Sequence, residues 1–297
     1  MRFMVVVLFT LGLHSVCCNP CPTSCSCNKE GAVECRGNIM DIPKPLSVHT
    51  YLLILQETNI KVLNNQVLQP LILLLRLSIA HSILDTIQPE AFNVAPQLVS
   101  VKLSSNRLSS LPPGVFQSLT NLEQLHLDGN QITSVSPELF KGLGNLTELD
   151  LSMNRISHLY HLPHMQKLTL YNNPLDFLPE RLVGIMTNLK ELYLYSTSLT
   201  TVPWNLFLNQ LKSLHPQQFR IFHELENIEV IELHKNQLQT LPGDVFAISN
   251  FTHTLKNITL ADNPWNCSCS IMGFSTWIRN NPSLNGQSCF VPEVCSA

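Results

Sequence analysis

The sequence is poor in charged residues and has no run of lysine and arginine. Charged residues make up 13% of the 297 residues, and the formal net charge is −3. A nucleic-acid partner would need a basic stripe or patch, so this composition argues against one. Enzyme signatures are also absent: there is no G-x-S-x-G, no H-E-x-x-H and no glycine-rich phosphate loop. We therefore expect no enzyme activity, no small-molecule substrate and no cofactor.

Long apolar runs are scarce, and the one at the amino terminus is typical of a secretory signal. Arg2 precedes the apolar stretch 3–13, and Val16 and Cys18 are small enough for the −3 and −1 positions of a cleavage site. This run is too short for a span of about 20 residues. We therefore expect residues 1–18 to be removed. The mature protein is then secreted or extracellular, or on the cell surface if the chain is a fragment.

A second apolar stretch, 71–75, is shorter still and is followed by Arg76. It does not reach the length of a membrane span. We therefore expect membrane association only through a partner or through a missing carboxy-terminal segment.

No cysteine lies between Cys35 and Cys267, although the chain has ten. If Cys17 and Cys18 leave with the signal, an even set of four remains near each end. Such sets in a secreted chain favour disulfides over zinc ligation. The two sets are Cys21, Cys25, Cys27 and Cys35, and Cys267, Cys269, Cys289 and Cys295.

A repeat fills the cysteine-free part of the chain. The pattern L-x-x-L-x-L-x-x-N-x-L/I begins at Leu98, Leu122 and Leu146, with a period of 24. Alternating apolar positions predict a short strand with one buried face, and the Asn side chain can bond backbone groups where the chain turns away. One turn cannot bury its apolar side alone, but stacked turns can. The sequence therefore predicts an α/β repeat solenoid: a leucine-rich repeat horseshoe with a parallel β-sheet on its concave face.

Other copies are less regular. Two disguised copies come first, with Thr58 and Ser82 in the Asn place, and Phe92, Phe116 and Phe140 recur as a predicted core column. Later copies start at Met165, Leu189, Ile228 and Leu255, so one turn is short and one interval is long. The segment 201–227 in that interval is either a damaged repeat or an irregular bulge.

The cysteine-rich ends resemble the caps of extracellular leucine-rich repeat proteins. The motifs are C-P-x-x-C-x-C-x7-C and N-P-W-N-C-S-C, the latter followed by Phe274, Trp277 and Ile278 at helical spacing. The resemblance implies disulfide caps at both ends, with the pairs Cys21–Cys27, Cys25–Cys35, Cys267–Cys289 and Cys269–Cys295. The expected organisation is a signal at 1–18, a cap at 19–49, repeats at 50–262 and a cap at 263–297.

A finer resemblance lies in the runs HKNQLQTLPGDVF and KLTLYNNPLDFLP and in the carboxy-terminal cap. They resemble the families of platelet glycoprotein V and of the non-catalytic subunit of carboxypeptidase N. The first implies an adhesion-receptor subunit whose stalk and membrane helix this chain lacks. The second implies a secreted subunit that stabilises a plasma carboxypeptidase. An antigen-binding receptor of similar repeats fits the disguised first copies poorly.

The register predicts which residues line the concave face. The fifth and seventh positions of successive copies bring Tyr171, Tyr193 and Tyr195 together. Clustered exposed tyrosine is typical of an interface centre, although tyrosine also simply suits strands. We predict that the face binds an extracellular protein ligand, or a receptor or enzyme subunit. The predicted binding residues are His126, Asp128, Asp150, Tyr171, Tyr193 and Tyr195.

Metal binding is not expected. His158, His161 and His164 recur every third residue, but they fall in the loop of the short turn, where histidine is simply solvated. We expect Asp128 and Asp150 to form at most a carboxylate pair on an open sheet that does not exclude water, so they are not suited to acid–base catalysis.

Glycosylation sequons occur at Asn145, Asn250 and Asn257; a weaker one at Asn266 has a cap cysteine in its middle position. A glycan on Asn257 would sit at the third strand position of the last copy. It would then shield the carboxy-terminal end of the concave face.

Overall fold

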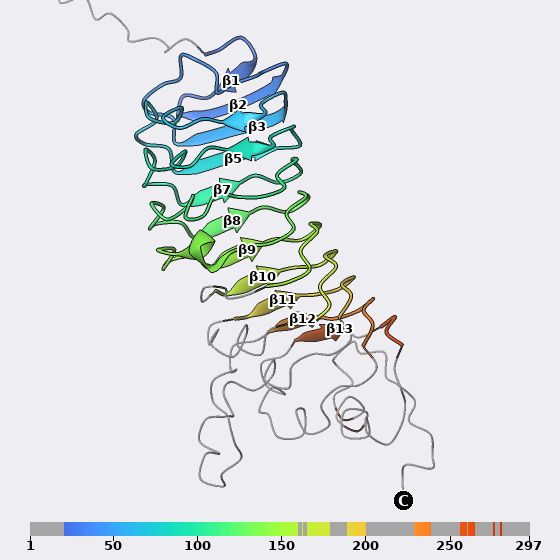
Figure 1. The fold of residues 1–297 in the computed structure, drawn as a ribbon. Helices are drawn as coiled ribbons and strands as arrows, with labels where there is room; N and C mark the ends of the chain where they lie inside the picture. Colours follow the sequence, from blue (N-terminus) through green and yellow to red (C-terminus); the bar gives the residue numbers. More distant parts are fainter. Residues whose placement is uncertain are drawn as a thin grey trace, which may run out of the picture.

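The computed structural model describes residues 21–159, 162, 165–178, 189–199, 229–238, 256–259, 261–264, 276 and 280. Its strands stack one above the next along a solenoid (Figure 1). Within the described residues they form an 11-stranded sheet in the order β1-β2-β3-β5-β7-β8-β9-β10-β11-β12-β13. The strands are β1 (Cys25–Cys27), β2 (Ala32–Gly37), β3 (Leu52–Thr58), β5 (Arg76–Ala80), β7 (Ser100–Lys102), β8 (Gln124–His126), β9 (Glu148–Asp150), β10 (Lys167–Thr169), β11 (Glu191–Tyr193), β12 (Val230–Glu232) and β13 (Asn257–Thr259).

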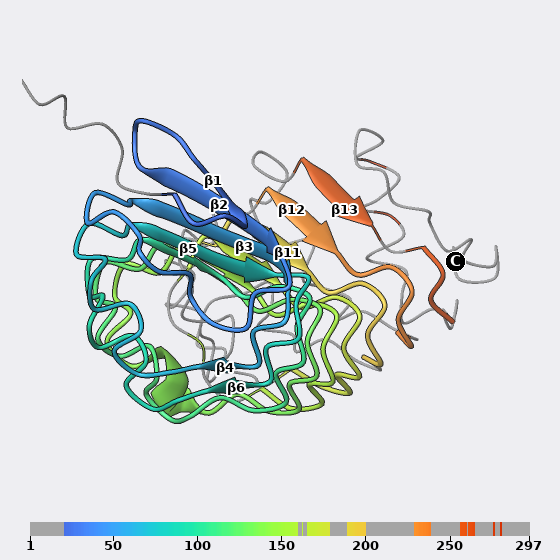
Figure 2. The same ribbon diagram turned by 90° about the horizontal axis from the view of Figure 1, so that it is seen from above.

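The pair β1–β2 is antiparallel, and every later pair in this sheet is parallel. The opposite side of the solenoid carries turns, the paired strands β4 (Val62–Leu63) and β6 (Thr86–Ile87), and the 3-10 helix η1 (Pro137–Phe140) (Figure 2). The predicted fold class, a leucine-rich repeat solenoid with a parallel sheet, is confirmed.

The core follows the repeat pattern. The leucines that define each copy are buried, as Leu98, Leu122 and Leu146 show. Phe92 and Phe116 are also fully buried, with ring centroids 5.3 Å apart. Phe140 is 6% exposed, so the predicted phenylalanine column is confirmed as core. Each such side chain stabilises the solenoid by about 1.5–3 kcal/mol.

A column of asparagines joins adjacent turns. The Asn130 amide donates to the carbonyls of Leu103 and Leu127, each at 2.9 Å, while its Oδ1 accepts from the N–H of Leu108 at 3.1 Å. In the first copies, Ser82 Oγ accepts the N–H of Thr58 at 2.9 Å. The hydroxyls thus supply part of the bonding that asparagine supplies elsewhere. The pattern of Asn130 recurs at Asn106, Asn154 and Asn173.

The eighth position of each copy turns the chain out of the strand in the left-handed conformation. Its φ is 51° at His81 and 66° at Gly129, and only the latter is a glycine. The other copies carry a side chain here, at a cost of roughly 1 kcal/mol or more each. The repeated turn therefore presents exposed side chains at the edge of the sheet, Met153 among them.

The irregular intervals leave the sheet in register. Asp150 pairs with Thr169 although they are 19 residues apart, and Tyr193 pairs directly with Glu232, 39 residues further on. No strand therefore intervenes between β11 and β12 in the sheet. The segment 201–227 itself lies outside the described residues.

The amino-terminal cap contains both disulfides that the resemblance implied, Cys21–Cys27 and Cys25–Cys35. Its strand β1 pairs with β2 and covers that edge of the parallel sheet (Figure 1). The signal 1–18, the four carboxy-terminal cysteines, and Phe274, Trp277 and Ile278 of the predicted cap helix lie outside the described residues. In the part of the chain that is described, no helix has the length and apolarity to cross a membrane.

Candidate functional site

The strand register places the predicted binding residues side by side on the concave face. At the fifth position, Lys102 pairs with His126 and His126 pairs with Asp150. The column continues through Thr169 to Tyr193. The central strands carry these residues because their intervening positions are buried leucines, which forces the fifth position outward. Asp128, Tyr171 and Tyr195 occupy the seventh position of their copies.

Three rings on the concave face form a continuous stack. The centroids of Tyr171 and Tyr195 are 4.4 Å apart with the planes at 7°, and those of Tyr195 and His234 are 4.5 Å apart at 9°. We call these three residues the aromatic stack. The rings lie about one strand spacing apart, because each is at the seventh position of adjacent turns. His234 Nδ1 contacts Thr259 Oγ1 at 3.0 Å, which orients the last ring.

The tyrosines of the stack are half-buried and lie near carboxylates. Burial, followed by the neighbouring Tyr171 and the charges of Glu232 and Asp150, raises the pKa of Tyr195 to about 12. The hydroxyl of Tyr195 is therefore neutral at physiological pH. A neutral tyrosine hydroxyl can both donate and accept a hydrogen bond, and that of Tyr195 already interacts with Tyr171.

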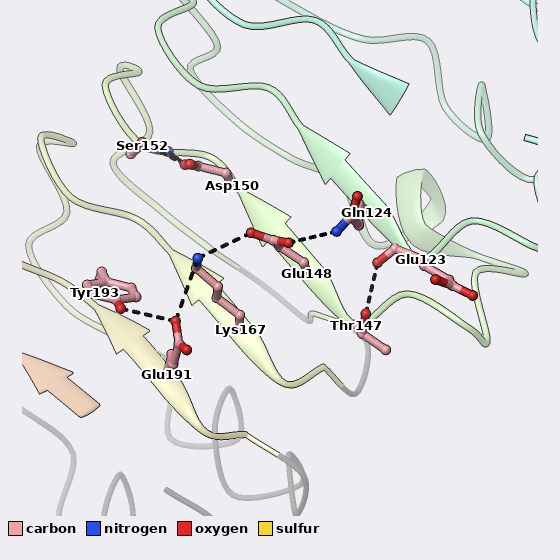
Figure 3. A network of polar contacts seen from close by, with 9 residues as sticks. All are labelled: Glu123, Gln124, Thr147, Glu148, Asp150, Ser152, Lys167, Glu191 and Tyr193. Carbon is pink, nitrogen blue, oxygen red and sulfur yellow. Dashed lines mark hydrogen bonds and ion pairs between the residues drawn. The ribbon is translucent and has the colours of Figure 1, made fainter. Parts of the chain in front are cut away.

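Tyr193 belongs to a separate polar network on the same face (Figure 3). Its hydroxyl donates to Glu191 Oε2 at 3.0 Å, and Lys167 Nζ lies 5.8 Å from its ring centroid. Lys167 also pairs with Glu148 at 3.3 Å and with Glu191 at 3.6 Å. Burial opposes the charge of Lys167, but the two glutamates outweigh it and raise the pKa of the ammonium group. Burial and then Glu191 raise the pKa of Tyr193.

His126, Asp128 and Asp150 converge at the amino-terminal side of the stack, and we call them the carboxylate–histidine cluster. Their nearest ligand atoms all lie within 4.8 Å of one another, and no other such group occurs in the described part of the chain. Burial raises the pKa of Asp150, and the charge of Asp128 raises it further. The hydrogen bonds from Ser152 oppose this rise without cancelling it. The donor set suits a divalent cation or a cationic side chain.

Each aspartate of the cluster is held by a serine. Ser104 Oγ donates to Asp128 Oδ1 at 2.6 Å, and Ser152 donates to Asp150 Oδ1 through its Oγ at 2.6 Å and its N–H at 2.9 Å. These bonds use one oxygen of each carboxylate. The other oxygen, Oδ2, accepts no hydrogen bond from any described residue.

The remaining candidates lie elsewhere. His158 contacts the ring of Phe177 at 5.2 Å and Ser157 Oγ at 2.8 Å, while His161 and His164 lie outside the described residues. Asn145 is exposed, and its amide donates to Thr120 O at 2.9 Å. Asn257 is on β13 and pairs with Val230 of β12. It occupies the third strand position that the repeat pattern predicts. Asn250 and Asn266 lie outside the described residues.

Sequence reasoning placed the six predicted residues on one face but missed three features. It did not select His234 for the site, and it did not foresee the stack or the Lys167 network. His234 occupies the seventh position of its copy, as Tyr171 and Tyr195 do. This shared position is the sequence feature that could have placed His234 in the site. The third position carries Glu148, Lys167 and Glu191, which the sequence analysis did not assign to the site.

Comparisons with known proteins agree with this fold. Residues 96–156 match the family model described as leucine rich repeat. A Caenorhabditis elegans relative, peroxidasin homolog pxn-2, is 27% identical over 105 residues. That match covers 34% of this chain and spans only 8% of the length of the relative.

Two solved structures share the fold along most of the chain. Human 5T4, also named Wnt-activated inhibitory factor 1 and trophoblast glycoprotein, matches with a TM-score of 0.62 and 22% identity, covering 93% of this chain and 94% of that one. A chain from the octameric complex of latrophilin 3, Unc5D and FLRT2 matches with a TM-score of 0.60 and 23% identity, covering 93% and 95%. At these identities the likeness establishes the fold alone.

Proposed function

We propose that this chain is an extracellular binding protein whose concave face receives a protein partner at the aromatic stack. The observation that carries the proposal is the row of three half-buried rings, Tyr171, Tyr195 and His234, on an open sheet face. Tyrosine offers large apolar area and a hydroxyl at low rotamer cost, so such residues dominate the binding energy of interfaces. We assign the face no enzymatic role, because its paired carboxylates lie on an open sheet.

An extracellular location is supported by the two cap disulfides, which persist in oxidising compartments. It is also supported by the apolar stretch 3–13, which is typical of a secretory signal. The structural relative FLRT2 was solved in a complex with latrophilin 3 and Unc5D, so a solenoid of this shape is compatible with protein partners.

Two narrower forms of the proposal rest on the sequence resemblance in 167–179, in 234–246 and in the carboxy-terminal cap. One is a glycoprotein V-like adhesion-receptor subunit, and the other is a stabilising subunit of a plasma carboxypeptidase. A full-length transcript with a stalk and an apolar helix favours the receptor. Carboxypeptidase activity that co-purifies with the chain favours the enzyme subunit.

A glycan placed on the concave face tests the general proposal. Tyr195→Asn creates an Asn-Ser-Thr sequon within the stack, and Arg107→Asn creates an Asn-Leu-Ser sequon at an exposed loop position. Wild type and both variants are expressed in secreting cells, checked for occupancy by mass spectrometry, and screened against an array of secreted and cell-surface ectodomains. We expect binding that the Tyr195→Asn glycan abolishes and the Arg107→Asn glycan leaves intact. An array without a binder, or binders indifferent to the first glycan, would contradict the proposal.

A further inference from the structure

The aromatic stack ends at Tyr171. One turn towards the amino terminus, the seventh position is Ser152, and one turn beyond it is Asp128. In the described part of the chain, no ring and no cation lies on the face of Tyr171 that is turned away from Tyr195. Ser152 is buried, and its side chain of two heavy atoms is too short to cover the outer part of the ring. The stack therefore has an end face that another flat group can extend.

Two carboxylates flank that end face. Asp150 is at the fifth position of the turn that carries Ser152. Asp128 is on the adjacent turn towards the amino terminus. Ser152 and Ser104 hold the Oδ1 atoms of the two aspartates, which orients both carboxylates and leaves each Oδ2 without a hydrogen bond from any described residue. The end of the stack thus combines a ring face with two free acceptors.

The surrounding face is acidic. The third, fifth and seventh positions from β8 to β12 carry five carboxylates and one ammonium group. Their formal charge is −4 with the histidines neutral. The one ammonium group, that of Lys167, is already paired with two of those carboxylates. A cationic partner group is therefore favoured here, and an acidic one is repelled. The charged residues are Asp128, Glu148, Asp150, Lys167, Glu191 and Glu232.

The chain itself shows the same arrangement on the neighbouring strand. Lys167 places its ammonium group 5.8 Å from the ring centroid of Tyr193 and between Glu148 and Glu191. At Tyr193 the cation comes from this chain. At Tyr171 the ring and the acids are present, and the described residues supply no cation.

We propose that the partner inserts an arginine at this point, with its guanidinium stacked on the free face of Tyr171 and its N–H groups donating to Asp150 and Asp128. The inference rests on the proposed function and specifies the chemistry of the partner. Arginine fits better than lysine, because its planar, weakly hydrated fork both stacks on a ring and bonds two carboxylates. A divalent cation would use Asp128, Asp150 and His126, but it would not need Tyr171.

The test uses the full secreted chain and a fluorescein-labelled Arg-Gly repeat peptide, with citrulline-Gly and Lys-Gly peptides of the same length. Fluorescence anisotropy is measured at low and at physiological ionic strength, with and without EDTA. The variants are Tyr171→Leu and Asp150→Asn. The charge-matched control is Glu138→Gln, in the 3-10 helix η1 on the opposite side of the solenoid. Circular dichroism confirms that each variant is folded.

We expect the arginine peptide to bind the wild type at least about tenfold more tightly than the citrulline peptide, and more tightly than the lysine peptide. Tyr171→Leu and Asp150→Asn should each weaken it by about tenfold, while Glu138→Gln and EDTA should have no effect. Three results would overturn the inference: equal binding of the citrulline peptide, equal loss in Glu138→Gln, or binding that EDTA removes and zinc restores.

A protein partner found on the array separates this inference from the proposed function. A partner that is lost with the Tyr195→Asn glycan, but binds Asp128→Asn and Asp150→Asn as tightly as the wild type, leaves the proposed function standing and refutes the arginine contact. A partner indifferent to all three variants refutes both.

Discussion

The ring of Tyr195 lies face to face with the ring of Tyr171, with the centroids 4.4 Å apart and the planes at 7°. The two residues are 24 apart in the sequence and occupy the same position of adjacent turns. A solenoid converts such a period into direct contact, because each turn lies about one strand spacing from the next. The ring stack of the concave face is therefore built by the same repeat that builds the core.

Asn154 holds two adjacent turns together. Its amide donates to Leu127 O at 2.9 Å and Leu151 O at 3.0 Å, and its Oδ1 accepts from the N–H of Ile132 at 2.9 Å. Asn154→Ala leaves these buried groups unpaired, so we expect a loss of about 2–3 kcal/mol in urea denaturation followed by circular dichroism. Asn121→Ala is the control, because its exposed amide makes one bond of 3.4 Å. Equal losses in the two variants would contradict the role of the asparagine column.

Two glycines of the amino-terminal cap differ in what surrounds them. Gly31 and Gly37 have φ values of 99° and 97°, so alanine is strained at both positions. A Cβ at Gly31 would lie 2.3 Å from the carbonyl oxygen of His49, whereas one at Gly37 meets nothing within 4 Å. We expect Gly31→Ala to destabilise the protein by at least about 1 kcal/mol more than Gly37→Ala in thermal denaturation. The reverse order would show that the cap does not pack as described.

The carboxylate of Asp150 predicts a pH dependence of stability. Its pKa is raised above the ordinary 3.8, chiefly by burial, so the folded state binds the proton more tightly than the unfolded state. This group therefore stabilises the fold below its ordinary pKa, and the contribution is lost as the pH rises through the folded pKa. Asp150→Asn keeps an acceptor for Ser152 but carries no charge. We expect its melting temperature to exceed that of the wild type at neutral pH.

The advantage of Asp150→Asn should shrink as the pH falls towards 3.8 and below. Asp85→Asn is the matched control, because Asp85 is exposed and accepts a bond from Thr86 Oγ1 at 2.7 Å. Melting curves across this range, read by circular dichroism, measure both. A stability gap that widens in acid would contradict the burial of the Asp150 charge.

The fold and the concave register followed from the spacing of leucines. A one-residue slip would turn every buried leucine such as Leu125 or Leu149 outward, so the pattern specifies which residues face the open side. The placement of His126, Asp150 and Tyr193 in one column is a consequence.

The stack was harder to foresee. His234 reaches Tyr195 only because β11 pairs directly with β12 across 39 residues, and the sequence left the intervening segment open between a damaged repeat and a bulge. Ring orientation also depends on side-chain rotamers, which spacing does not report. The same holds for Lys167, whose position between two glutamates is a property of three adjacent turns.

The most direct test of the central claim is the dissociation constant of a protein partner identified on the array, measured for Tyr195→Ala and for Phe177→Ala. Both remove a partly exposed aromatic ring, but Phe177 lies outside the sheet, against His158. If the concave face binds the partner through the stack, Tyr195→Ala weakens binding by on the order of 2 kcal/mol, about 30-fold. Phe177→Ala should leave the affinity unchanged. Unchanged affinity in folded Tyr195→Ala would contradict the account.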